Sequence, residues 1–192
     1  GGIQTIIVVS IAALIFPVIW MGILGRLPFF LKVVKDFYFK VRLPKLKNEF
    51  ILFIGAGLLA TSITYSQLGD YIPLFLGHVV GNSGFLLSFV VIFSCVLLSA
   101  LGVHPIITVV IFGNTVNPGA YHISPTYMAL ILAISWTMGI TVCPSAATLI
   151  AISGLTGEST VTIGLRWNLF YVLACAIMLV LILSLFSTAG LI

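Results

Sequence analysis

Two short stretches place polar side chains beside helix-breaking residues inside long apolar runs. The first is GVHP at residues 102–105, and the second is TVCPS at residues 141–145. An ionisable residue within an apolar span is costly and is a candidate for function. His104 is the only ionisable residue of this kind between the two polar arms, residues 69–82 and 154–165, that are described below. As a neutral imidazole it can donate an N–H to an anion, and as a titrating group it can carry a proton. The alternative is that it only caps carbonyl groups where a helix ends.

Pro144 predicts an interruption of the second stretch, because proline lacks an N–H and clashes with the preceding turn. Thr141 and Ser145 flank it with hydroxyl groups. Freed backbone groups next to hydroxyls are typical of a binding site in a membrane transporter. Two alternatives remain: a simple kink accommodated by neighbouring helices, and hydroxyls that bond back to their own helix.

A catalytic interpretation of the same residues is weaker. Ser145 or Cys143 would act as nucleophile with His104 as base, as an intramembrane enzyme requires. No oxyanion hole is recognisable, and the sequence has no phosphate-binding glycine loop, H-E-x-x-H or C-x-x-C motif. We therefore do not expect an enzyme.

The composition requires lipid as the main solvent. Hydrophobic residues make up 61% of the chain and charged residues only 6%, whereas soluble domains carry about 25% charged residues. The sequence predicts an all-α polytopic membrane protein. Three cysteines, all in apolar segments, do not suggest a disulfide framework.

Seven of the eight basic residues lie between Arg26 and Lys47. A basic loop between apolar segments indicates the cytoplasmic face of a membrane rather than a nucleic-acid surface. We expect residues 1–25 to form a transmembrane helix and residues 26–49 a basic cytoplasmic segment along the interface. That segment is either a linker with anchoring aromatics or a partner-binding surface. The chain starts without Met or a signal peptide, which suggests a processed chain or a fragment.

Residues 50–192 are predicted to form a second membrane unit. It begins with a span at 50–67 and an interfacial arm at 69–82. Residues 83–118 follow, with a second leg that is too short to cross a bilayer. Either the first leg spans and a short segment re-enters, or both legs form a re-entrant helical hairpin with its tip inside the membrane. We favour the hairpin, because a Gly-Pro tip needs protein or water around it. A discontinuous helix at 126–153, a second arm at 154–165 and a last span at 166–188 complete the unit, with the C-terminus outside.

This order of elements resembles the C-terminal repeat of the ion transporter superfamily, which includes TRAP large membrane subunits, divalent anion:Na⁺ symporters and citrate-type carriers. Three stretches carry the resemblance from Phe50 onward: FILFIGAGLLATSITYSQLGDYIP, LLSALGVHPIITVVIFG and TVCPSAATLIAISGLTGESTVTIGL. The sequence departs from the symporter pattern, which has Ser-Asn-Thr where Val103-His104-Pro105 stands. Ser145 replaces the second proline of the TRAP motif.

The resemblance implies a secondary transporter half that moves a small anion, such as an organic acid, with Na⁺ or H⁺ by alternating access. It also implies a missing N-terminal repeat or partner subunit, a bacterial inner membrane location and a homodimer as an allowed assembly. A sodium ion near Gly102 and Pro144 is compatible with it, and no other cofactor is expected. The substrate and ion site would comprise Ser99, Gly102, His104, Pro105, Thr108, Thr141, Cys143, Pro144, Ser145 and Thr148. A non-transporting membrane scaffold or assembly subunit is the alternative.

Overall fold

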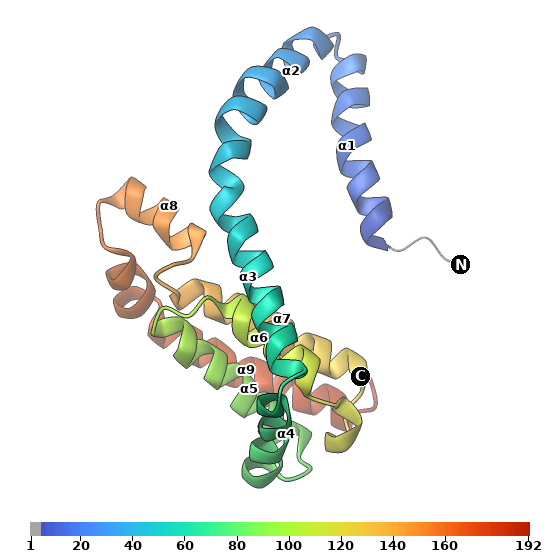
Figure 1. Cartoon of the computed structure of the whole chain (residues 1–192), viewed down its shortest axis with the longest axis vertical. Helices are drawn as coiled ribbons and strands as arrows, with labels where there is room; N and C mark the ends of the chain where they lie inside the picture. Colours follow the sequence, from blue (N-terminus) through green and yellow to red (C-terminus); the bar gives the residue numbers. More distant parts are fainter. Residues whose placement is uncertain (1–4) are drawn as a thin grey trace. The chain divides into compact units, whose positions relative to one another are not determined.

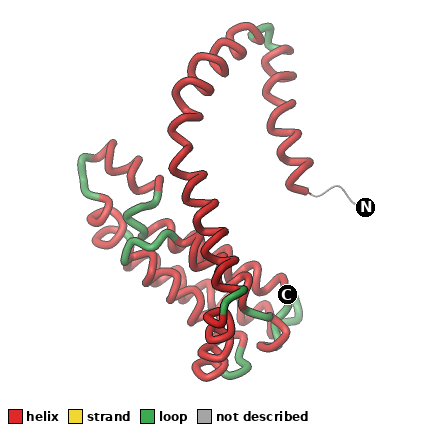
Figure 2. Tube along the Cα trace, viewed as in Figure 1, coloured by secondary structure: helices red, strands yellow, loops and turns green. Residues whose placement is uncertain are grey.

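The computed structural model describes residues 5–192, and this part of the chain consists of helices, turns and loops without a strand (Figure 2). The all-helical prediction is confirmed for this range. Residues 1–4 of the predicted first span, and the side chains of Arg42 and Lys45 in the basic segment, lie outside the described residues. The chain divides into two units, Gly1–Leu52 and Phe53–Ile192, close to the predicted start of the second membrane unit at residue 50.

The first unit is a run of helices broken by one tight turn. Helix α1 (Thr5–Ile23) continues through Pro17, and Gly25 then turns the chain with a φ of +65°. Helix α2 (Leu27–Val33) leads without a loop into a π-helical stretch, η1 (Val34–Arg42), a 3₁₀ turn, η2 (Leu43–Leu46), and the start of α3 (Lys47–Thr64). The predicted basic segment is thus helical along almost its whole length, with Lys40 paired to Asp36 at 2.7 Å one turn away.

Helix α4 (Gln67–Val80) follows α3 after a sharp bend of 77°. Gly69 permits the bend, because a Cβ at this position would lie 2.6 Å from the carbonyl oxygen of Ile63. The segment predicted as an interfacial arm, residues 69–82, is therefore mostly helix. Its depth in a membrane stays a prediction.

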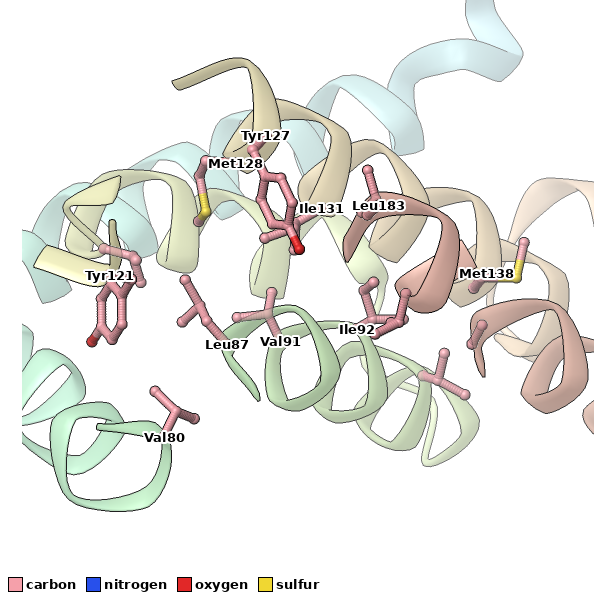
Figure 3. Packing of buried hydrophobic residues seen from close by; sticks show 14 of the residues in the cluster. Val80, Leu87, Val91, Ile92, Tyr121, Tyr127, Met128, Ile131, Met138 and Leu183 are labelled. Carbon is pink, nitrogen blue, oxygen red and sulfur yellow. The ribbon is translucent and has the colours of Figure 1, made fainter. Parts of the chain in front are cut away.

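The core of the second unit lies where α5 (Gly84–Ala100), α7 (Pro125–Val142) and α9 (Leu169–Thr188) pack together (Figure 1). Buried residues recur every third or fourth position along each helix, which places them on one stripe. Figure 3 shows Leu87 and Val91 of α5 close to Tyr127 and Ile131 of α7 in this cluster. The hydroxyl of Tyr127 accepts a hydrogen bond from Ser88 at 2.9 Å, which satisfies a buried polar pair.

The outer faces of the same helices are apolar as well. Leu97, Phe170 and Leu185 expose 62%, 86% and 65% of their surface, although a water-facing helix would carry polar residues there. Within residues 5–192, two helical segments, Pro125–Thr156 and Leu169–Thr188, are long and apolar enough to cross a membrane, and the bent α3–α4 pair is a third if counted as one span. These lengths and compositions are those of membrane helices.

Two interruptions divide the helices of this unit. Residues 101–104, here called the tip, connect α5 to the shorter α6 (Pro105–Thr115), and η3 (Pro118–Tyr121) then leads to α7. Residues 143–146, here called the break, separate α7 from α8 (Ala147–Thr156). Both interruptions fall at the glycine and proline positions singled out in the sequence. Whether either lies within a bilayer stays a prediction.

The second predicted arm, residues 154–165, is less irregular than expected. Its first residues complete α8, which ends at a left-handed Gly157 with φ +76°. A short loop follows, and the π-helical η4 (Thr162–Trp167) then leads into α9. Gly164 in η4 packs against the end of α7, because a Cβ there would lie 2.7 Å from the carbonyl oxygen of Val142. The arm therefore supports the start of the break.

Candidate functional site

The tip is built by local backbone rules. Helix α5 ends in a Schellman motif: the N–H of Gly102 donates to the carbonyl of Ser99 at 2.9 Å, and the N–H of Val103 donates to the carbonyl of Leu98 at 3.0 Å. Gly102 has a φ of +98°, a conformation that favours glycine. These bonds pair the last carbonyls of α5 while leaving the carbonyls of Gly102 and Val103 directed outward from the turn.

His104 starts helix α6 as its N-cap. Its Nδ1 accepts a hydrogen bond from the N–H of Ile106 at 3.3 Å, and Pro105 occupies the first helical position, where a missing N–H removes no helical bond. The half-buried imidazole also packs edge-on against Trp136 of α7, with ring centroids 5.8 Å apart. His104 thus connects the tip to α7 and has a definite orientation.

The break begins where Pro144 ends the hydrogen-bond ladder of α7. Cys143 is the last residue whose N–H bonds back into the helix, to the carbonyl of Gly139 at 3.0 Å, and the N–H of Ala146 closes a turn onto the carbonyl of Cys143. Helix α8 then starts at Ala147 without a side-chain cap. Its first turn therefore lacks the usual side-chain acceptor for N–H groups at a helix N-terminus.

The tip and the break touch each other although about forty residues separate them. Ser145 Oγ donates a hydrogen bond to the carbonyl of Gly102 at 3.2 Å, and the Cys143 thiol points to the carbonyl of Val103 at 3.7 Å. Cys143 Sγ and Ser145 Oγ lie 3.1 Å apart. The two outward carbonyls of the tip are thus partnered by side chains of the break.

Gly139 makes this approach of the two segments feasible. A Cβ on this residue would lie 2.7 Å from Pro105 Cβ, 2.8 Å from Ser99 Oγ and 3.3 Å from Cys95 Sγ. Cys95 in turn directs its thiol to the carbonyl of Ser135 on α7 at 3.3 Å. The two legs of the hairpin and α7 therefore meet at one tightly packed point.

Two hydroxyl groups beside this point have no hydrogen-bond partner. Ser99 on α5 is fully buried, Thr108 on α6 is 4% exposed, and the oxygen of each side chain is unpaired. The one polar side chain beside both is the Cys95 thiol, which is at most a weak hydrogen-bond partner. A buried unpaired hydroxyl costs about 1–3 kcal/mol. In native structures such groups are paired with an ordered water, an ion or a ligand, or they store strain.

The remaining predicted residues are placed differently. The Thr141 hydroxyl donates to the carbonyl of Thr137 at 2.8 Å. It is therefore satisfied within its own helix, as one of the two alternatives held. Thr148 is exposed on the first turn of α8. Conversely, Trp136 and Gly139 of α7 contact the tip and the start of α6, but the sequence did not predict them as site residues. The only sequence signal for Gly139 is its spacing of four residues from Cys143, which places both on one face of α7.

A cavity of about 380 Å³ lies between α4, α5 and α6, reaches the tip at Val103 and is lined in part by Thr108. Its walls are almost entirely apolar, with Tyr71, Phe75 and Ile107 among the lining residues. Apart from the hydroxyls of Tyr71, Ser94 and Thr108, this lining offers an anion no partner. We therefore include Thr108, but not the rest of the cavity, in the candidate site.

The residues around the tip and the break offer hydrogen-bond donors and two helix N-termini to a small polar ligand. Among the described residues no group of three or more His, Cys, Asp and Glu side chains could hold a metal ion. Helices α6 and α8 both start at the site, and helix N-termini attract negative charge. Comparison of the chain with known protein families, with curated proteins and with solved structures gives no match.

Proposed function

We propose that this chain is a polytopic membrane protein and the C-terminal half of a secondary active transporter that moves a small anion with Na⁺ or H⁺. The supporting observation is the contact between the tip and the break, where Ser145 and Cys143 reach the carbonyls of Gly102 and Val103. Interrupted helices are tolerated at membrane depth only where protein or water surrounds them. Two interruptions in contact are the arrangement that transporters use for binding.

An anion is favoured by the charge distribution around the site. The sequence contains no Asp, Glu, Lys or Arg between Asp70 and Glu158. No carboxylate within this stretch would repel a negative ligand. The helix N-termini of α6 and α8 and the unpaired hydroxyls of Ser99 and Thr108 supply donors in its place.

In the proposed cycle the hairpin and the broken helix form the moving body. The direct bonds from Ser145 and Cys143 hold tip and break together in the state described here. A ligand that accepts from these side chains would replace the bonds and change the relative position of the two segments. We propose that a second repeat, from another chain or another part of the protein, provides the opposite wall and that a membrane scaffold including α1 and α3 stays in place.

Transport is tested in proteoliposomes made from the protein as it occurs in its native membrane, together with any chains that copurify. Radiolabelled pyruvate, succinate, citrate and phosphate are offered under imposed Na⁺ gradients and under imposed pH gradients. We expect at least one of these anions to accumulate above the level in protein-free liposomes. Absence of gradient-driven uptake of every anion in the panel would remove the basis for a transporter.

A matched pair of serine variants links transport to the site. Ser99→Ala removes an unpaired hydroxyl of the cluster, whereas Ser94→Ala removes a hydroxyl on another face of the same helix, in the wall of the apolar cavity. We expect Ser99→Ala to reduce uptake while Ser94→Ala leaves it unchanged, with equal amounts of both variants in the membrane. Equal uptake by both variants would place the site elsewhere.

A further inference from the structure

His104 is in a position where its hydrogen bond depends on its protonation state. Nδ1 accepts from the N–H of Ile106, so this nitrogen carries no proton in the observed geometry, and the neutral ring carries its hydrogen on Nε2. Protonation of Nδ1 would turn the acceptor into a donor that faces another donor. The cap of α6 would be lost, and a positive charge would stand at the positive end of the helix dipole.

The elements around His104 offer little to balance such a charge. The titratable side chains on the elements that pack around it are Cys95 on α5, Tyr127 on α7, Cys143 in the break, and Asp70, Tyr71 and His78 on α4. Asp70 and Tyr71 are exposed near the start of α4, and His78 is exposed and bonded to the carbonyl of Leu74 at 2.8 Å. None of these contacts His104 in the structure through a hydrogen bond or an ion pair.

Trp136 is the one neighbour suited to a cationic imidazole. Its ring centroid is 5.8 Å from that of His104, which is within the range of cation–π attraction. A ring contact keeps the imidazolium near the tip but does not neutralise it. Full compensation therefore requires an anion that arrives from outside the protein.

We propose that His104 is the binding site of the coupling ion, a proton, and that the imidazolium and the substrate anion occupy the site together. This inference rests on the proposed function and narrows the coupling ion from Na⁺ or H⁺ to H⁺. The proton bound on Nδ1 releases the N–H of Ile106, which then becomes available to the anion along with the unpaired hydroxyls of Ser99 and Thr108. Proton and anion bind cooperatively, because each supplies the charge that the other lacks.

The stoichiometry follows from the charges. One imidazolium balances one negative charge, so a monovalent anion such as pyruvate moves with one proton and no net charge. Its accumulation then follows the pH gradient, by about tenfold for each pH unit. The membrane potential has no effect on this ratio.

The proton site is tested without a substrate by tryptophan fluorescence. A cationic imidazole quenches a neighbouring indole, so we expect Trp136 emission to fall as the pH is lowered from 8 to 5. His104→Asn removes the titration and keeps the cap of α6, because Asn is a preferred N-cap residue. Trp136→Phe should remove the pH-dependent signal, whereas His122→Asn, a change of an exposed loop histidine, should leave it intact.

The coupling role is tested with the same variants in proteoliposomes. Under an inside-alkaline pH gradient without Na⁺, the unmodified protein should accumulate pyruvate, or whichever panel anion it moves. The His104→Asn variant, present in the membrane in the same amount, should no longer accumulate it. His122→Asn should behave as the unmodified protein.

The outcomes separate the two proposals. If no anion of the panel moves under any gradient, the proposed function fails. If an anion moves but its accumulation follows Na⁺, or if His104→Asn still accumulates it on a pH gradient, only the proton assignment fails. Emission from Trp136 that stays flat between pH 8 and 5 would also overturn the assignment, since the ring contact places the two side chains together.

Discussion

Gly139 is the position where a single added carbon tests the packing of the site most directly. In Gly139→Ala the new Cβ would lie 2.7 Å from Pro105 Cβ and 2.8 Å from Ser99 Oγ. Carbon atoms prefer separations of about 3.5–4.0 Å. The start of α6 must therefore withdraw from α7 by roughly 1 Å.

Such a displacement separates the tip from the break. The bond from Ser145 Oγ to the carbonyl of Gly102 is already 3.2 Å long, so a shift of this size breaks it. Overpacking costs about 1–3 kcal/mol, and loss of the hydrogen bond costs about 1 kcal/mol. Replacing glycine by alanine inside a helix stabilises the folded state by about 1 kcal/mol. The net destabilisation is about 1–3 kcal/mol.

The assay combines thermal unfolding in detergent with alkylation by N-ethylmaleimide, with the modified cysteines located by peptide mass spectrometry. Cys143 is fully buried against the tip, whereas Cys175 on α9 is partly exposed and serves as an internal reference. We expect Gly139→Ala to lower the unfolding temperature and to speed alkylation of Cys143. Alkylation of Cys175 should stay the same.

Gly154→Ala is the matched control, because a Cβ at Gly154 of α8 meets nothing within 4 Å. This variant should be as stable as the unmodified protein or more stable, by up to about 1 kcal/mol. If Gly139→Ala matches Gly154→Ala in stability and leaves Cys143 protected, the tip is not packed tightly on α7 and the reasoning fails.

Three further substitutions test other parts of the site. Thr108→Val removes an unpaired buried hydroxyl, so thermal unfolding should show a stability higher by about 1 kcal/mol. The same variant should take up less anion, and unchanged uptake would exclude this hydroxyl from binding. Gly164→Ala places a Cβ 2.7 Å from the carbonyl oxygen of Val142, so the free energy of unfolding should fall by about 1–3 kcal/mol. An unchanged unfolding temperature would contradict this contact. In Gly102→Ala the new Cβ meets no atom within 4 Å, but alanine must adopt a φ of +98°. We therefore expect backbone strain alone to lower the free energy of unfolding by about 1–2 kcal/mol. An unaltered unfolding curve would mean that the tip relaxes.

The interruptions of the helices follow from short-range chemistry, and the sequence is sufficient to locate them. Gly102 provides the left-handed residue after α5, and Pro105 provides the first position of α6, both within a few residues of the turn. Pro144 acts on the turn directly before it. Steric exclusion and missing N–H groups operate over at most four residues, so these effects do not depend on the rest of the fold.

The partners across the site required the tertiary structure. Ser145 meets Gly102, and His104 meets Trp136, only because α7 has one particular rotation about its axis relative to the hairpin. Helix α7 is apolar on nearly all sides, so its hydrophobic pattern does not indicate which face turns inward. The bond from Thr141 to the carbonyl of Thr137 is local, and the sequence had already allowed it as one of the alternatives.

By itself, the sequence determined that apolar helices dominate this chain, that its basic charge is concentrated between Arg26 and Lys47, and that two helices are interrupted near His104 and Pro144. Those properties depend on composition and on neighbours a few residues away. The tertiary structure decided that the two interruptions touch, that Gly139 is the point of closest approach, and that Ser99 and Thr108 are left without partners. Contacts between segments about forty residues apart depend on how whole helices pack, and no local pattern specifies that packing.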